Sequence, residues 1–266
     1  MKALPLITLS TDFGLQDGFV GVMKGIIYSI CPEARLVDIT HAIPPQDILA
    51  GALVLERSLP YFPANSVHLA VVDPGVGTGR RPMAAQMGDQ WLVGPDNGLF
   101  TLLYLQAERL GQPIRAVHLD QPRFWRAQVS HLFHGRDIFA PVAAHLANGV
   151  ALAELGSPLP EPIRLELPQP QRVEGGWRCL VMAVDYFGTL QLNLTRADLA
   201  DAPIKTVEVA GIKIEGLCLA FGDRPPGSLM ALMDSSDHLS IAVVNGSAAA
   251  HLNVRVGAEV LVSLVL

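Results

Sequence analysis

The chain has 266 residues, of which half are hydrophobic, and a formal net charge of −6 with no block of like charges. This length allows one large domain or two smaller ones, with ample material for a core. Nucleic-acid binding needs a basic face that displaces counterions, and a membrane span needs a longer apolar run than any present. We therefore expect a small-molecule partner, with no nucleic acid and no membrane.

The three cysteines, Cys31, Cys179 and Cys218, lie far apart and form no CxxC pair. Their number and spacing favour neither a zinc site nor a disulfide framework, and each lies in an apolar run. The first residues lack the apolar stretch of a secretory signal. These features predict buried thiols in a cytoplasmic protein.

The first 150 residues alternate strand-like and helix-like patterns. Strands are expected over 6–10, 36–40, 67–72, 91–93 and 114–117, and helical spacing of apolar residues covers 17–30, 47–55, 99–110 and 138–147. Asp47 begins the second of these helices, and Pro60 ends it. Such alternation predicts a layered α/β domain with a largely parallel sheet.

The composition then changes. Five prolines lie between Pro158 and Pro170, which is typical of a semi-rigid connector. Beyond Val173 the pattern is one of short strands, with a hairpin expected over 206–215. We expect a three-layer α/β domain over 1–160, a Pro-rich linker over 161–172, and a smaller β-barrel-like domain over 173–266.

Polar residues cluster where strands of the first domain end. Asp12 follows the first strand, Asp73 and Arg80 belong to the loop after the third, and His134 precedes the last helix. Parallel sheets bind ligands at the carboxyl ends of their strands, so these loops could gather the four residues around one crevice.

Structural interpretations compete with this one. Asp12 could be only a turn or cap residue, and the glycine-rich loop 75–79 a tight turn without the GxGxxG or GK[ST] pattern of phosphate binding. A lone loop histidine such as His134 is commonly not catalytic. Four other histidines are assigned structural roles: His41, His68, His118 and His251.

A metal site is also conceivable, built from Asp12, Asp17 and histidines. No HxH or HExxH spacing favours it, so we expect no metal.

The motifs nevertheless form an ordered set over nearly the whole chain: 10–14, 24–25, 29–32, 37–41, 72–78, 94–99, 133–137, 185–188, 235–236 and 239–242. In this order they resemble the S-adenosylmethionine (SAM) hydroxide adenosyltransferases, which are adenosine-forming SAM hydrolases related to fluorinase and chlorinase. The resemblance implies the same two-domain fold and a homotrimer. SAM would be held between the N-terminal domain of one subunit and the C-terminal domain of its neighbour, as substrate and without a cofactor.

The resemblance also implies roles for substrate-binding residues. Asp12 would accept hydrogen bonds from the two ribose hydroxyls. Asp185, together with Ser235 or Ser236, would hold the methionine amine and carboxylate. Two further residues, Phe221 and Asn245, would contact adenine.

The hydrolase branch is distinguished by an Asp, Arg and His set, matched here by Asp73, Arg80 and His134. The halogenating relatives have an aromatic residue at the position of Asp73, and a carboxylate there should repel halide and accept a proton from water. The resemblance therefore implies hydrolysis of SAM to adenosine and L-methionine by activated water or hydroxide at the ribose C5′. It leaves open which of Asp73 and His134 takes the proton, and whether another adenosyl compound is preferred.

Two departures from the family pattern concern substrate binding. Thr189 stands where the family has Asn after Phe-Gly, and Asp237-His238 stands where many relatives have Gly-Tyr. Both bear on nucleoside affinity and leave the nucleophile site unchanged.

Three alternatives to the hydrolase are considered: a SAM-dependent halogenase, a non-catalytic SAM- or adenosine-binding protein, and a metal-dependent phosphatase or nuclease that chelators would inactivate.

Overall fold

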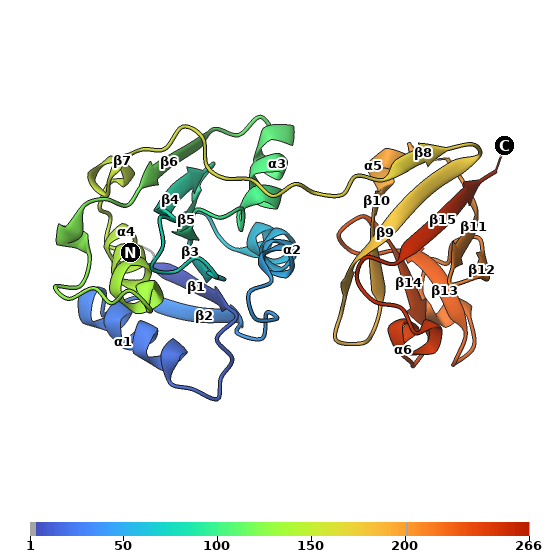
Figure 1. Ribbon diagram of the computed structural model, residues 1–266, viewed down its shortest axis with the longest axis horizontal. Helices are drawn as coiled ribbons and strands as arrows, with labels where there is room; N and C mark the ends of the chain where they lie inside the picture. The colour runs from blue at the N-terminus through green and yellow to red at the C-terminus, as the bar shows by residue number, and fades with distance from the viewer. Residues whose placement is uncertain (1–3, 201, 266) are drawn as a thin grey trace. The chain divides into compact units, whose positions relative to one another are not determined.

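The computed structural model describes residues 4–200 and 202–265, and the chain divides into two compact units between Leu165 and Glu166. The first unit has a seven-stranded sheet of order β2-β1-β3-β5-β4-β6-β7 between two layers of helices (Figure 1). Its strands are β1 Leu6–Thr11, β2 Arg35–Thr40, β3 Val67–Val71, β4 Pro82–Met87, β5 Gln90–Pro95, β6 Ile114–His118 and β7 Ser157–Pro158.

Four neighbouring strands, β2, β1, β3 and β5, run parallel, whereas β4, β6 and β7 pair antiparallel. The predicted α/β class with a largely parallel sheet is confirmed. Strand β4 was not predicted because Pro82-Met83-Ala84-Ala85 lacks the β-branched residues that mark strands. Pairing on both sides, with β5 and β6, makes this segment a strand.

Helices α1 (Phe19–Ile30) and α4 (Ala140–Ala147) cover one face of this sheet, and α2 (Ile48–Ser58) and α3 (Thr101–Arg109) cover the other (Figure 1). Asp47 is the N-cap of α2, and its carboxylate accepts from the Ala50 amide at 2.9 Å. A π-helical turn, Gly135–Phe139, leads into α4, and short 3₁₀ turns occur at Leu59–Tyr61, Pro122–Phe124 and Leu152–Glu154.

The second unit is an antiparallel sheet that curls into a nearly closed barrel, as predicted. Strands β12-β11-β15-β9-β10-β14-β13 follow one another, and β8 pairs with β9. Their bounds are β8 Gln171–Val173, β9 Gly176–Val184, β10 Leu190–Thr195, β11 Ile204–Val209, β12 Ile212–Glu215, β13 Leu229–Met233, β14 His238–Val243 and β15 Glu259–Leu264. Two short helices, α5 (Arg196–Leu199) and α6 (Ala248–Leu252), and a 3₁₀ turn at Phe221–Asp223 complete the unit.

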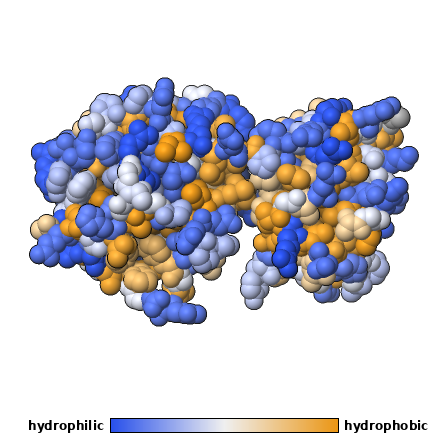
Figure 2. Space-filling view, viewed as in Figure 1, coloured by the Kyte–Doolittle hydropathy of each residue, from blue (hydrophilic) through white to orange (hydrophobic). Residues whose placement is uncertain are grey.

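The hairpin predicted over 206–215 is β11–β12. Its turn residues, Ala210 and Gly211, both have positive φ, at 50° and 77°, as a tight two-residue hairpin turn requires. Hydrophobic residues also reach the surface, as the face drawn in Figure 2 shows; Leu219 and Phe187 are among the most exposed in this unit.

The proline-rich segment is bonded at both ends. The Ile163 amide donates to Asp96 at 2.7 Å and the Leu165 amide donates to Thr101 at 2.8 Å, both within the first unit, while residues 171–173 form β8 of the second. All three cysteines are free and buried. Within the described part of the chain, no helix is long and apolar enough to cross a membrane.

Candidate active site

The carboxyl ends of β1 and β3 bring Asp12 and Asp73 to one edge of the sheet. Thr11 pairs with Val71 in the parallel register, so the residues after both strands emerge side by side. Asn97, which follows β5 at the same edge, donates from its side-chain nitrogen to the Val72 carbonyl at 2.9 Å. That bond fixes the backbone immediately before Asp73.

Arg80 returns from the loop after β3 and forms a two-pronged ion pair with Asp73. Its Nε donates to Oδ1 at 3.0 Å and its Nη2 donates to Oδ2 at 2.5 Å. Only 5% of the Asp73 side chain and 6% of the Arg80 side chain are exposed. The guanidinium also lies over the Phe139 ring, 5.3 Å from its centre. A bidentate pair packed on an aromatic ring has little freedom to reorient.

His134 completes the group, because its Nδ1 lies 3.1 Å from Arg80 Nη2. A guanidinium has only donors, so Nδ1 must accept, and a neutral imidazole then carries its proton on Nε2. Burial and the nearby Arg80 charge lower the pKa of His134, which favours this neutral form. The structure thus brings together the three residues predicted to be catalytic.

The electrostatic environment of Asp73 suits a proton acceptor. Burial raises the pKa of its carboxyl, against the opposing effect of the Arg80 charge and hydrogen bonds. A carboxylate with a raised pKa binds a proton more readily than one in water.

Asp12 has a structural contact as well as its predicted role. Its Oδ2 accepts from the Gln46 amide at 2.8 Å, and Gln46 is in the left-handed region with φ 67°. This bond joins two loops that lie 34 positions apart, so it is neither a local turn bond nor a helix cap. The residue is only partly buried, so the carboxylate also reaches solvent.

An aromatic cluster links the loop of Asp12 to the segment of His134. Phe13, Phe19 and Phe133 meet edge to face, with ring centres 5.4–6.0 Å apart. Since Phe13 follows Asp12 and Phe133 precedes His134, their packing holds the two polar residues at the same edge of the sheet.

Gly77 joins the loop of Arg80 to the segment of His134. It has φ +77°, and a Cβ there would lie 2.3 Å from the His131 carbonyl oxygen. Glycine adopts this backbone conformation with the least strain, and the lack of a Cβ permits the close approach. The glycine-rich loop is a tight turn, and it contacts the segment that carries His134.

Sequence reasoning missed Asp137, which was quoted within a motif but given no role. Its carboxylate is 0% exposed and accepts from Arg126, from Arg136 and from the Ser130 amide, at 2.7–2.9 Å. These hydrogen bonds outweigh the effect of burial and lower its pKa to about 2. An acidic residue next to Arg136 was the only available signal.

In the barrel unit, the predicted binding residues lie at opposite ends of the β13–β14 hairpin. Ser235 and Ser236 lie in the turn joining β13 to β14, beside the Met233–Leu239 pair, whereas Asn245 follows β14 beyond the Leu229–Val243 pair. The six residues of β14 span roughly 20 Å. The structure therefore does not gather Ser235 and Ser236 with Asn245.

Asp185 lies at the Asn245 end. It begins the turn between β9 and β10, and its Oδ1 accepts from the Phe187 and Thr189 amides at 2.9 and 2.8 Å. The Ala249 amide of α6 donates to the Gly188 carbonyl, which ties this turn to the segment after β14. Phe221, 50% exposed, lies in the loop between β12 and β13.

The residues at the two departures from the family pattern form hydrogen bonds or ion pairs with their neighbours. Asp237 occupies a left-handed position, φ 60°, where glycine is the least strained residue, and its carboxylate pairs with exposed Arg196 at 2.9 Å. His238 Nδ1 lies 3.1 Å from the Leu192 carbonyl. The Thr189 backbone amide donates to Asp185, and this hydrogen bond does not depend on which side chain stands at position 189.

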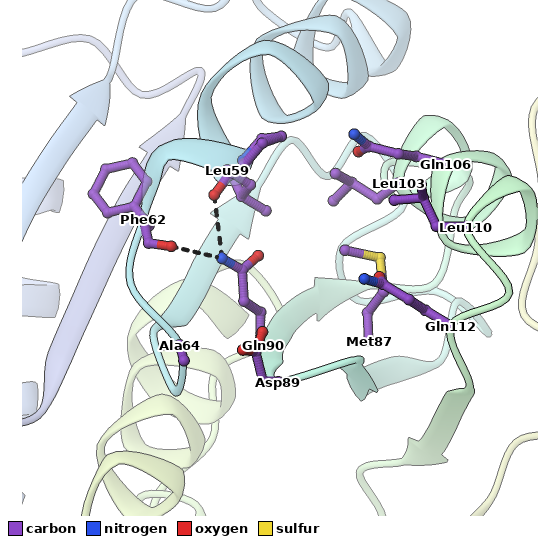
Figure 3. Close-up of a pocket in the computed structure, with 11 residues that line it drawn as sticks. Leu59, Phe62, Ala64, Met87, Asp89, Gln90, Leu103, Gln106, Leu110 and Gln112 are labelled. Carbon is purple, nitrogen blue, oxygen red and sulfur yellow. Dashed lines mark hydrogen bonds between the residues drawn. The ribbon is translucent and has the colours of Figure 1, made fainter.

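A separate cavity of about 310 Å³ lies at the opposite edge of the first sheet, near the amino end of β3 (Figure 3). Gln90 spans part of its wall, donating to the Leu59 and Phe62 carbonyls at 3.2 and 3.0 Å. None of the predicted site residues lines it. Among residues 4–200 and 202–265, no three His, Cys, Asp or Glu side chains form a cluster able to hold a metal.

Comparisons with known proteins follow the same division of the chain. Residues 7–156 match the SAM hydroxide adenosyltransferase N-terminal domain, and residues 179–261 match the corresponding C-terminal domain. A relative from Salinispora arenicola, named (R)-S-adenosyl-L-methionine hydrolase, is 44% identical over 99% of both chains. A fluorinase from an Actinoplanes species is more distant, at 32% identity over 75% of both chains.

A crystal structure of an uncharacterized conserved protein from Thermotoga maritima superimposes with a TM-score of 0.88 at 35% identity, covering 97% of this chain and 99% of the other. Both family domains are matched in order, and the Salinispora relative covers nearly the whole chain. The chain belongs to the SAM hydroxide adenosyltransferase family.

Proposed function

We propose that this chain hydrolyses S-adenosyl-L-methionine to adenosine and L-methionine. The observation that carries the proposal is the buried ion pair of Asp73 and Arg80, with His134 bonded to the same guanidinium. The name of the Salinispora relative adds a stereochemical element, and we propose the R configuration at sulfur for the substrate here.

The reaction is a single substitution at the ribose C5′. The water oxygen forms a bond to C5′ while the C5′–S bond breaks and its electron pair stays on sulfur. Methionine leaves as a neutral thioether, so the leaving group needs no general acid. The water loses one proton, which makes the overall products adenosine, methionine and a proton.

The geometry favours distinct roles for the three catalytic residues. His134 Nδ1 is already occupied by the Arg80 donor, so its Nε2–H is the group that donates to the water oxygen and orients it. Asp73, with its raised pKa, then accepts the proton. The Arg80 charge stabilises the developing hydroxide, a contribution that is large where bulk water is excluded.

The substrate contacts remain proposals that follow from the family resemblance. Asp12 offers an oxygen that no backbone amide occupies, which supports its role on the ribose hydroxyls. Phe221 and Asn245 are assigned to adenine, and Asp185 with Ser235 or Ser236 is assigned to the methionine amine and carboxylate. Within one barrel, Asp185 lies at the Asn245 end and the serines lie at the other end. A SAM molecule bridging neighbouring subunits of a homotrimer is proposed on the same basis. The buried free thiols support a reducing, cytoplasmic compartment.

The experiment incubates purified protein separately with the R and S sulfur epimers of SAM and quantifies nucleosides and methionine by chromatography. Parallel samples contain chloride, fluoride, no halide, or EDTA, and Asp73→Asn serves as the inactive control. We expect equimolar adenosine and methionine from the R epimer in every buffer, with loss of both products in the variant.

Other outcomes would exclude the proposal in different ways. A 5′-halogenated nucleoside that forms only with halide would place the chain with the halogenases. Binding without turnover would indicate a sensor of SAM or adenosine. Loss of activity in EDTA would indicate a metal-dependent reaction.

A further inference from the structure

The segment that carries His134 is held by a buried ion cluster. Asp137 lies three residues after His134, in the π-helical turn, and its carboxylate is fully buried. It accepts from Arg126 Nη1 at 2.8 Å, from Arg136 Nε at 2.7 Å and from Arg136 Nη2 at 2.9 Å. The Arg126 amide in turn donates to the Asp137 carbonyl at 2.9 Å.

These bonds close a loop around the catalytic histidine. Arg126 lies at the start of the 126–134 segment, and Ser130, in its middle, donates its amide to Asp137 Oδ2 at 2.8 Å. Ser130 Oγ then accepts from the Leu132 amide at 3.1 Å. One carboxylate thus binds the beginning and the middle of the segment and Arg136, two residues after His134.

Among the described residues, no hydrogen bond joins the Asp137 carboxylate to Asp73 or Arg80, so an effect on the reaction must pass through the segment that Asp137 holds. The same segment contacts the loop of Arg80 at Gly77, where the His131 carbonyl leaves no room for a Cβ. The Arg136 guanidinium, while paired to Asp137, also lies 5.2 Å from the centre of the Phe133 ring. Side chains on both sides of His134 are therefore fixed by the same cluster.

We propose that Asp137 is a positioning residue, which holds the 126–134 segment so that His134 Nδ1 accepts the hydrogen bond from Arg80. This inference rests on the proposed hydrolysis for its catalytic consequence, but its structural consequence is independent of it. An amide at position 137 presents a donor where two arginines and a backbone amide all donate. It therefore cannot replace the carboxylate.

The test compares Asp137→Asn with Asp120→Asn as matched control. Asp120 is a carboxylate of the same unit that accepts from the Ser157 amide at 3.1 Å and has no bond to the 126–134 segment. We expect Asp137→Asn to lower kcat by roughly 10²-fold, the cost of a misplaced catalytic group, with little change in KM. Asp120→Asn should retain the wild-type kcat.

A second readout does not depend on turnover. Nitrogen–proton correlation spectra of the imidazoles report which ring nitrogen carries the proton, with the His134 signal assigned by its absence in His134→Gln. We expect the wild-type protein and Asp120→Asn to show His134 with an acceptor Nδ1 at neutral pH. Asp137→Asn should lose that signature.

Arg126→Met keeps the test valid if Asp137→Asn does not fold, because Arg126 is 37% exposed at its side chain and Arg136 would still pair with Asp137. A smaller fall in kcat and a partial loss of the Nδ1 signature are expected. Unchanged His134 spectra in a folded Asp137 or Arg126 variant would overturn the positioning role. Wild-type protein that forms no adenosine while the spectra change as expected would refute only the proposed function.

Discussion

The predicted functional residues of the two units differ in burial and in hydrogen bonding. In the first unit, Asp73, Arg80 and His134 are buried or half-buried and bonded to one another, although 54 positions separate Arg80 from His134. In the barrel, Asp185, Asn245 and Phe221 are exposed, and Ser235 lies at the far end of a hairpin from Asn245. In the first unit, the groups that we propose to be catalytic are therefore already bonded to one another, whereas the proposed contacts of the barrel are separate.

This difference predicts how substitutions divide between the two kinetic constants. A group preorganised in the first unit should affect kcat, because its interactions strengthen in the transition state. A barrel residue that only contacts substrate should affect KM, because ground state and transition state use it equally.

The largest effect is expected for Arg80→Lys. An ammonium retains the charge but cannot donate to both Asp73 oxygens and to His134 at once. We expect kcat to fall by roughly 10²–10³-fold with little change in KM, in steady-state assays of adenosine formation. A near-normal kcat would show that the three-residue geometry is not needed.

The next effect concerns stability of the first unit in acid. His68 of β3 is fully buried, and burial lowers its pKa from 6.5 to about 4. The stability gained by keeping His68 neutral is therefore fully present above pH 6.5, and it is lost as the pH falls towards 4. A difference of this size corresponds to ~3 kcal/mol of unfolding free energy.

The measurement is urea unfolding of wild type and His68→Gln at pH 7.5 and pH 4, followed by hydrogen exchange in β1 and β3. Between these pH values the wild type should lose more stability than the variant, by about that amount. Equal losses of unfolding free energy in the two proteins would mean that folding does not lower the pKa of His68.

Gly77→Ala tests whether contact between the two catalytic loops matters. The added methyl would overlap the His131 carbonyl, and φ +77° is strained for alanine. We expect kcat to fall by ~10–100-fold as the loops separate. Gly79→Ala is the matched control, since a Cβ at Gly79 meets nothing within 4 Å. Similar behaviour of the two variants would argue against the contact.

The smallest effect is expected in the barrel, for Phe221→Ala. Loss of one apolar contact should raise KM by roughly tenfold and leave kcat unchanged. Ile212→Ala, an exposed apolar residue of the β11–β12 hairpin, should change neither constant. A fall in kcat for Phe221→Ala would contradict the expectation that barrel residues affect KM and residues of the first unit affect kcat.

The sequence predicted the layered fold because hydrophobic periodicity and capping residues are local signals. Asp47 illustrates this, since its position before an apolar helical pattern and its N-cap bond both follow from neighbours in the chain. Strand β4 lacked such a signal, and only its pairing with β5 and β6 defines it.

The sequence predicted which residues would form the candidate site, but it did not predict the hydrogen bonds that hold them. The loops after the strands were expected to gather Asp12, Asp73, Arg80 and His134, and the family resemblance supplied their roles. The four hydrogen bonds to Asp137 join residues up to eleven positions apart through a buried carboxylate. No periodicity encodes such a cluster, because it depends on how loops pack. The separation of Ser235 from Asn245 likewise follows from strand register, which residue order alone does not reveal.

In the proposed reaction, water positioned by Asp73, Arg80 and His134 attacks C5′ of SAM. Turnover of the R epimer in water labelled with heavy oxygen, followed by mass spectrometry of both products, shows where the water oxygen goes. We expect one labelled oxygen in the 5′-hydroxyl of adenosine and none in methionine. Unlabelled adenosine, or cleavage that leaves the label elsewhere, would contradict it.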